Sequence, residues 1–372
     1  MKDTRWISHK DAGASDNATY YFKKSFTLDA VAKSIIEISA QARYKLYVNG
    51  NFVCCGPCKG TREKTYFDCV DVTSYLNVGE NEIFCEVLQL VADDMQGKMS
   101  PIEGVIRVGS MLLCLELTSG DFVLSTDKTW LVAKAPVKHI SASSCYSAAT
   151  RELHDKTIDP VYENAVVVTG ISNAEVDHYW WGGTNKCFLH ERPIPMLDFS
   201  DKTDIVSFDG DFFEAKYLTF GFPTFKVKGK GTVRLYYFEC FTEIQGKTNN
   251  DRTDRTLDFT KEMYDEFTVD GEATFEPFWF RCFRFIKPEY TGDVTVELVK
   301  MTEVNYPMFP RTDYDFGRKD DNALWVLHLQ SSQRKTRRSE PTLTKRPVRR
   351  SSQEWVSFTL RSSLTDFSVS SR

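Results

Sequence analysis

Short apolar segments, roughly four to eight residues long, recur along most of the chain. Some alternate apolar with polar positions, and others are rich in β-branched and aromatic side chains, which is typical of strands buried on one or both faces. The clearest segments of the first half are 34–39, 43–48, 82–90, 111–117 and 165–169. The pattern predicts β-sheet rather than helix.

Turn signals separate these segments at regular intervals. The clearest are Asn49-Gly50-Asn51, Val78-Gly79-Glu80-Asn81 and Ser119-Gly120-Asp121. Glycine and asparagine adopt a positive φ at low cost, so each of these sites can close a hairpin. Short strands joined in this way favour an antiparallel sandwich or jelly roll.

A second series of strands follows the connector Glu191-Arg192-Pro193-Ile194-Pro195. Two prolines at short spacing favour a stiff, extended linker between domains. The strands predicted after it are 215–220, 224–228, 231–239, 265–269, 273–285 and 294–301. The polar segment 246–256 is expected to be a long loop.

The pattern changes after Tyr314. Ala323, Leu324, Val326, Leu327 and Leu329 share one face of a predicted helix, and the Ser- and Arg-rich segment that follows lacks any sustained periodicity. The expected fold is mostly β: two consecutive antiparallel β-sandwich (jelly-roll, galactose-binding-like) domains with a short C-terminal helix and a disordered tail. The expected boundaries are 1–188 and 189–308 for the sandwiches, 309–330 for the start of a helical domain, and 331–372 for the basic tail.

Composition agrees with β-sheet cores, because aromatic residues make up 13% of the 372 residues. The net charge of -5 is unevenly spread: residues 331–372 carry 10 Lys plus Arg against 3 Asp plus Glu, which leaves 37 against 49 for residues 1–330. An acidic body argues against a phosphate-binding surface, so no nucleic-acid partner is expected for it.

The first residues contain no apolar run that could form a signal-peptide core, and no segment is long enough to span a bilayer, so no membrane partner is expected. Ten cysteines at irregular spacing resemble small buried apolar residues more than a disulfide framework. A cytoplasmic location is the simplest expectation.

Cys55-Gly56-Pro57-Cys58 spells the redox motif of thioredoxins. That chemistry needs the first cysteine at a helix N-terminus, whereas here a strand-like segment follows, so a turn between strands is predicted. A zinc site that also uses Cys54 and Cys69 would lack a second, regularly spaced ligand pair. No metal and no cofactor are expected.

Three tryptophans are candidates for carbohydrate binding. Trp180 and Trp181 precede two glycines, and adjacent indoles there can present a flat apolar face to a sugar ring. The plainer alternative is that they pack between domains. Trp279 is expected to lie in a strand in which its neighbours Phe278 and Phe280 face the opposite side, so that both faces of the sheet are covered.

No catalytic residue is assigned. Carboxylates are plentiful between 251 and 266, but a glycosidase needs a pair at a fixed separation, and a solvated acidic face is the default interpretation. The six histidines show neither the spacing of a helical metal site nor a serine partner. The basic tail has two interpretations, a nuclear-import or nucleic-acid patch and the product of a shifted or truncated reading frame, of which the second is favoured.

The segment 42–53, followed by 56–60, Tyr66-Phe67-Asp68 and 72–81, resembles the sugar-binding jelly roll of bacterial glycosidases. A second set of motifs narrows this resemblance to the accessory sandwiches of alpha-L-rhamnosidases: 191–195, 237–239, 250–254, 264–267 and 275–286. Asn322-Ala323-Leu324-Trp325 is similar to the first helix of that family's (α/α) six-hairpin barrel. The resemblance covers residues 5 to 330.

The resemblance implies a non-catalytic accessory portion of a glycoside hydrolase acting on rhamnose-containing glycans. In that family the acid and base carboxylates lie in the barrel, so no catalytic residue carries over, and we expect a truncated or frameshifted, inactive chain. Exposed surface that would face the barrel could support homo-oligomers. The alternatives are a stand-alone carbohydrate-binding β-sandwich protein and an interaction protein whose basic tail binds an anionic partner.

Overall fold

The computed structural model of the protein describes residues 4–12, 17–40, 42–58, 64–89, 112–140, 150–169, 171–172, 185–186, 188–241 and 253–307. These residues form strands almost throughout, with only two short 3-10 turns, η1 (Thr73–Tyr75) and η4 (Thr203–Ile205). The prediction of a mostly β sandwich fold is confirmed. None of the helices among these residues is long and apolar enough to cross a membrane.

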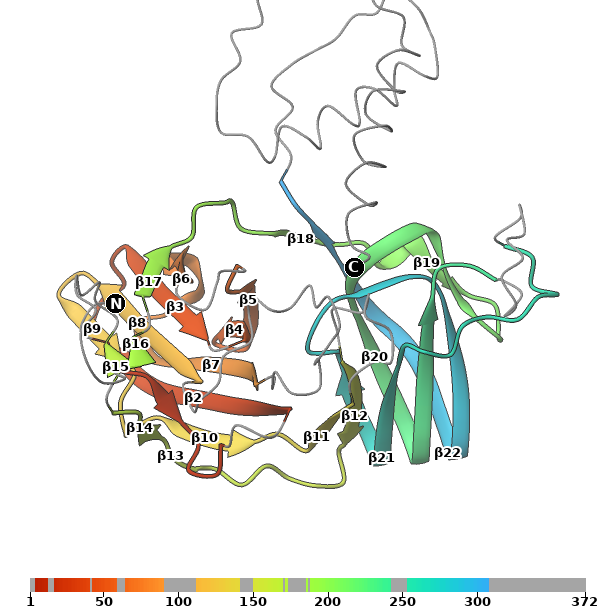
Figure 1. The fold of residues 1–372 in the computed structure, drawn as a ribbon, viewed down its shortest axis with the longest axis horizontal. Coiled ribbons are helices and arrows are strands. Elements are labelled where there is room, and N and C mark those ends of the chain that lie inside the picture. The colour runs from red at the N-terminus through yellow and green to blue at the C-terminus, as the bar shows by residue number, and fades with distance from the viewer. Residues whose placement is uncertain are drawn as a thin grey trace, which may run out of the picture. The chain divides into compact units, whose positions relative to one another are not determined.

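The first sandwich consists of two facing sheets (Figure 1). One has the order β14-β1-β8-β3-β6-β17, with β9 paired to β8, and the other has the order β13-β10-β2-β7-β4-β5. The strands are β1 (Ile7–Ser8), β2 (Ala18–Leu28), β3 (Ser34–Ala40), β4 (Arg43–Val48), β5 (Asn51–Gly56), β6 (Lys64–Asp71), β7 (Gly79–Gln89), β8 (Leu113–Ser119), β9 (Phe122–Ser125), β10 (Leu131–Lys134), β13 (Glu163–Asn164), β14 (Val166–Val167) and β17 (Phe188–Glu191).

Alternation along the strands builds the core between these sheets. Tyr44, Leu46 and Val48 of β4 point into it and are fully buried, as are Ile36 and Ile38 of β3. The predicted turn Asn49-Gly50 is confirmed, because both residues have a positive φ and join β4 to β5 with a two-residue loop. The predicted segment 165–169 forms only the short strand β14, just after β13.

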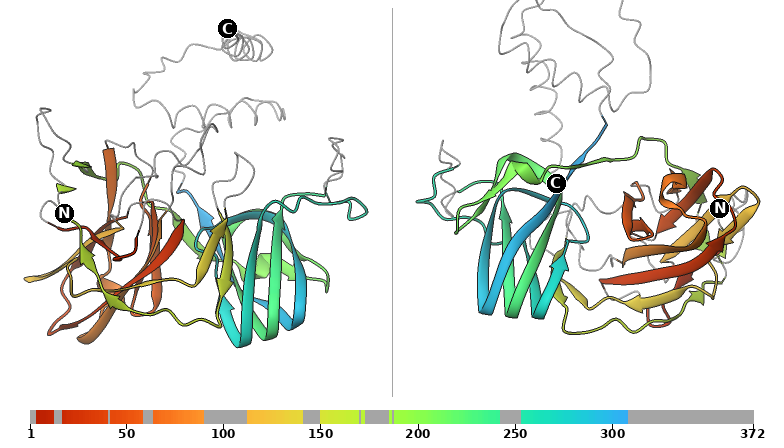
Figure 2. Two further views of the ribbon diagram at one scale, coloured as in Figure 1. Left: turned by 60° about the horizontal axis from the view of Figure 1, so that its bottom comes forward. Right: turned by 180° about the vertical axis from the view of Figure 1, so that it is seen from behind.

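The second sandwich is built from three long strands of 26, 12 and 25 residues, which lie side by side in Figures 1 and 2. Its sheet has the order β11-β12-β21-β20-β22-β18, with β19 paired to β20. The strands are β11 (Val137–Ile140), β12 (Arg151–Asp155), β18 (Asp198–Asp201), β19 (Val206–Phe208), β20 (Phe213–Phe238), β21 (Tyr264–Phe275) and β22 (Arg281–Asn305); β15 (Ile171–Ser172) and β16 (Asn185–Lys186) pair separately.

Bends in the long strands enclose the second core. Phe285 pairs with Glu214 near one end of β20 and with Phe238 at the other, so β20 flanks β22 on both sides. At the bend Gly229 has a φ of +117°, and a Cβ there would lie 2.0 Å from the carbonyl oxygen of Asp293. Only glycine permits this approach, which lets the ladder turn sharply between two layers.

Two predictions about this region need correction. The segments predicted as separate strands between 215 and 239 form one continuous strand, β20. The predicted strand 273–285 is interrupted, because β21 ends at Phe275 and β22 begins at Arg281. Pro277 lies in the gap and has no N–H to continue a ladder. Trp279 therefore lies in a bend and not in an alternating strand.

The two sandwiches share part of the chain. β12 pairs in parallel with β21, with Leu153 opposite Glu266 and Asp155 opposite Thr268. Residues from the predicted first domain thus complete the sheet of the second sandwich. The predicted connector begins at Glu191, the last residue of β17, and the backbone N–H of Arg192 donates to the carbonyl of Phe67. The predicted helix at 323–329 and the tail 331–372 lie outside the described residues.

Candidate functional site

The outer face of β4 carries charged side chains that are buried. Because side chains alternate along a strand, Arg43 and Lys45 point away from the core that receives Tyr44 and Leu46. Lys45 donates to the carbonyl of Pro277 at 2.9 Å and forms an ion pair with Glu276. Both side chains thus face residues of the second sandwich.

Trp279 lies at the same contact. The guanidinium carbon of Arg43 is 4.3 Å from the centroid of its indole ring, and the Phe280 ring lies 5.1 Å away. The Lys45 ammonium is in turn 4.1 Å from the centroid of the Phe222 ring. Such cation–π contacts strengthen when water is excluded. We call the contact formed by Arg43, Lys45, Glu276, Trp279 and Phe222 the seam.

Of the three predicted carbohydrate-binding residues, the structure describes Trp279. Trp180 and Trp181 lie outside the described residues. Trp279 is partly buried, packs against Cys55, Phe222 and Val304, and has the guanidinium of Arg43 over its ring. Its role in sugar binding stays a prediction, and a sugar ring could stack only on the exposed part of the indole.

A buried ionic network lies beside the seam. Arg281 donates from Nε and Nη2 to Asp265 at 2.8 and 2.6 Å, and from Nη2 to Glu152 at 2.8 Å. Glu152 also accepts the backbone N–H of Phe278 at 2.8 Å, and its own N–H donates to Asp265 at 3.0 Å. All three side chains are at most 2% exposed. The network therefore connects β12, β21 and the start of β22.

Burial and charge act in opposite directions on these carboxyl groups. Burial raises the pKa of Asp265 even though Arg281 is bound to it. For Glu152 burial alone would also raise the pKa, but the charge of Arg281 and the hydrogen bond from His154 outweigh it and hold this pKa below its usual range. Both carboxylates are fully used by internal donors, which leaves neither available to a substrate.

Two histidines extend the network toward the first sandwich. His154 Nε2 lies 3.0 Å from Glu152 Oε2. His139 is held at both ring nitrogens, by the hydroxyls of Thr19 and Thr150 at 2.8 Å each. Burial lowers the pKa of His139 to about 4, so the ring is neutral at pH 7. Because Thr19 belongs to β2, this bond joins the two sandwiches.

The thioredoxin-like motif lies at the end of β5, as the prediction of a turn between strands required. Cys55 is buried, and burial raises the pKa of its thiol to about 12, the opposite of a reactive thiolate. Gly56 is required by its neighbours, since a Cβ there would lie 2.1 Å from Asp68 Oδ2. Asp68 in turn binds the hydroxyl of Tyr44 and, at 2.8 Å, Nε of Arg192.

Sequence reasoning missed the buried charges of Arg43, Lys45, Glu152 and Arg281. The interpretation of the carboxylates between 251 and 266 as a solvated face is wrong for Asp265, which is buried. Only β4 offered a signal, since it places two cations and Tyr47 on the face opposite its core residues. The partners of Arg281 come from strands more than a hundred residues apart, so their spacing in the sequence carries no signal. Among the described residues, His, Cys, Asp and Glu side chains do not gather in a group of three that could hold a metal ion.

No protein-family model matches the sequence, and no curated protein matches it. Solved structures do resemble it. The alpha-L-rhamnosidase from Dictyoglumus thermophilum aligns with a TM-score of 0.51 and 15% identity over 82% of this chain and 35% of that one. The native enzyme from Aspergillus terreus gives a TM-score of 0.51 and 18% identity over 82% and 36%.

A third structure, the Streptomyces avermitilis alpha-L-rhamnosidase complexed with L-rhamnose, aligns with a TM-score of 0.50 and 18% identity over 78% of this chain and 29% of that one. The chain thus spans about a third of the length of these proteins. At such identities the likeness shows the fold, and the fold is rhamnosidase-like.

Proposed function

We propose that this chain is the non-catalytic accessory portion of an alpha-L-rhamnosidase-like glycoside hydrolase and that it binds rhamnose-containing glycans. The observation that carries the proposal is the likeness of the paired sandwiches to about a third of three rhamnosidase chains. Trp279, an indole with a partly accessible surface, is the described candidate for stacking on a sugar ring.

The hydrogen bonds that the buried carboxylates make within the protein support a non-catalytic role. Glycoside hydrolysis requires one carboxyl group as acid and a second as base or nucleophile, both reaching the same glycosidic bond. Glu152 and Asp265 bind Arg281 and backbone amides, and Asp68 binds Tyr44 and Arg192. None of these groups can exchange its internal partner for a substrate without breaking the structure around it.

The test uses the full chain and two measurements. With a chromogenic aryl alpha-L-rhamnoside we expect no release of the phenol above the uncatalysed rate, and steady turnover would overturn the non-catalytic role. With rhamnose-containing oligosaccharides we expect heat of binding by calorimetry, while cellobiose serves as a control. Absence of binding to every rhamnose-containing probe would overturn the carbohydrate-binding role.

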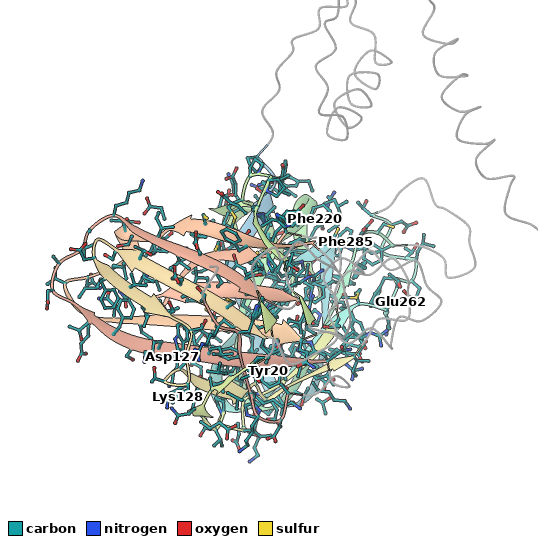
Figure 3. All side chains as sticks on the ribbon, turned by 60° about the vertical axis from the view of Figure 1, so that its left-hand side comes forward. Tyr20, Asp127, Lys128, Phe220, Glu262 and Phe285 are labelled. Carbon is teal, nitrogen blue, oxygen red and sulfur yellow. The ribbon has the colours of Figure 1, made fainter. Side chains whose placement is uncertain are left out.

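We also propose that the chain self-associates through exposed apolar side chains of β20. Tyr217, Leu218 and Phe220 are each close to half exposed, Phe220 at 47% (Figure 3). Three large apolar side chains so close together on one strand are unusual for a free surface. Sedimentation of the full chain should show a dimer or larger species that Leu218→Asp converts to monomer; a wild-type monomer would refute this. The cytoplasmic location stays a prediction.

A further inference from the structure

The strand β20 carries a bulge near its start, opposite β22. The register leaves four residues of β20, 215–218, opposite the single residue Arg284 of β22. In a regular strand successive side chains point to opposite faces, so one of two neighbours is usually covered. Here Lys216, Tyr217 and Leu218 are all exposed, although they follow one another in the chain. A bulge redirects side chains in this way, and this one turns two large apolar side chains toward solvent.

A cation and an anion lie beside these apolar side chains. Lys216 Nζ is 3.8 Å from Asp204 Oδ2, and the two side chains are 64% and 78% exposed. Charge-assisted hydrogen bonds are about 2.7–2.9 Å long, so this ion pair is loose and both groups are open to another partner. The hydrogen bond to Glu303 raises the pKa of Tyr217, and the charge of Asp204 raises it further, so Asp204 lies within electrostatic reach of the phenol.

Glu303, the other acidic group beside Tyr217, is held within the chain. Its Oε1 accepts the hydroxyl of Tyr217 at 3.0 Å, and its Oε2 accepts the side-chain amide of Asn305 at 3.0 Å. Lys216 and Asp204 are therefore the two opposite charges that a second molecule at the bulge would meet.

We infer that two copies of the chain meet at this bulge around a two-fold axis, with Lys216 of each copy paired to Asp204 of the other. A two-fold interface is reciprocal: where one residue contacts a second residue on the partner, the second contacts the first. An axis that passes between two opposite charges places each charge opposite its counterpart on the other copy. The inference rests on the proposed self-association and narrows it from any oligomer to a two-fold dimer.

The charges favour a second copy over a partner of one sign. A polyanion at the bulge would be repelled by Asp204, and a polycation by Lys216. A surface that carries both signs side by side is complementary to itself. Leu218 and Phe220, 45% and 47% exposed, supply the apolar surface that such a contact would remove from water.

Charge reversal tests the pairing, with sedimentation equilibrium of the full chain as the measurement. Lys216→Glu places like charges opposite one another, and symmetry makes it do so twice, so the dimer should dissociate about ten times more readily or worse. Asp204→Lys should do the same. An equal mixture of the two variants should recover the affinity of the wild type, because each variant supplies the charge that the other one lacks.

The matched control is an ion pair on the same strand, away from the bulge. Lys230 Nζ lies 2.7 Å from Asp270 Oδ2, and the side chains are 79% and 58% exposed. Lys230→Glu and Asp270→Lys, alone or mixed, should leave the dimer as stable as that of the wild type. Circular dichroism of each variant shows that its fold is kept.

The outcomes separate the two-fold arrangement from self-association itself. A wild-type chain that stays monomeric overturns both. A dimer that Leu218→Asp breaks but both reversals leave unchanged keeps the apolar association and overturns the pairing of Lys216 with Asp204. Reversals that weaken the dimer without recovery on mixing also overturn this pairing, because the contact is then not reciprocal. Species that grow beyond a dimer with concentration indicate a head-to-tail contact and overturn the two-fold axis.

Discussion

Arg281→Met tests the buried network most directly. The substitution keeps most of the side-chain volume but removes the only cation bonded to Asp265 among the described residues, together with three hydrogen bonds of 2.6–2.8 Å. Two carboxylates, each at most 2% exposed, would then remain buried without their cation. Removing one partner of a buried ion pair costs about 3–5 kcal/mol, so we expect a loss of this size in the free energy of unfolding.

Arg234→Met provides the matched control. Arg234 also binds one carboxylate through two nitrogens, since Nε and Nη2 lie 2.9 and 2.6 Å from Glu266 Oε2. Its side chain, however, is 40% exposed. Exposed ion pairs contribute about 0–1 kcal/mol, so this variant should differ little from the wild type.

Urea unfolding, followed by tryptophan fluorescence at several pH values, measures both losses. In Arg281→Met burial should hold the pKa of Glu152 and Asp265 above their values in the unfolded chain. The folded state then binds more protons than the unfolded state, so the deficit should shrink as pH falls toward the folded-state pKa values and grow as pH rises. A loss below about 1 kcal/mol at pH 7, or equal losses for Arg281→Met and Arg234→Met, would refute the reasoning.

Three other predictions concern single sites. Gly56→Ala should cost on the order of 1–3 kcal/mol, because the new methyl group would lie 2.1 Å from Asp68 Oδ2; a change in the urea midpoint within experimental error would contradict the close approach. Burial lowers the pKa of His139 from 6.5 to about 4, so the folded state binds fewer protons than the unfolded state between these two values, and the free energy of unfolding should decline as pH falls through this window. His139→Gln should flatten that decline. An unchanged dependence of the free energy of unfolding on pH would show that another group is responsible. The Cys55 thiol, whose pKa burial raises to about 12, should resist a thiol reagent in the folded protein at pH 8. Cys69 is exposed, so it should react before Cys55 even though partial burial raises its thiol pKa to about 11. Mass spectrometry of the labelled peptides identifies the order, and early labelling of Cys55 would count against its burial.

Local features of this fold could be predicted because their causes are local. The pattern along 43–48 predicted a strand, and the alternate residues Tyr44, Leu46 and Val48 of that strand lie in a core. The Asn49-Gly50 turn followed from the two residue types that tolerate a positive φ. In each case the deciding interaction lies within a few residues, where a sequence pattern carries the information.

Non-local features could not be predicted in the same way. The pairing of β12 with β21 joins residues about 110 positions apart, and the segment 151–155 looks like any short strand. The interruption at Pro277 could have been predicted, since a proline between two strand patterns argues against one continuous strand. The aromatic residues on both sides of Pro277 led to the prediction of one continuous strand, because aromatic residues are enriched in strands.

The burial of Arg43 and Lys45 shows that the alternation of polar and apolar residues in a strand does not always predict which residues are exposed to water. A polar residue that alternates with a core residue is expected to face water, but it faces another layer when a second domain covers that side of the sheet. The charges are then retained only with specific partners: Lys45 with Glu276 and the carbonyl of Pro277. Because hydrogen bonds are directional, these contacts form in only one arrangement of the two sandwiches, whereas an apolar contact would tolerate sliding.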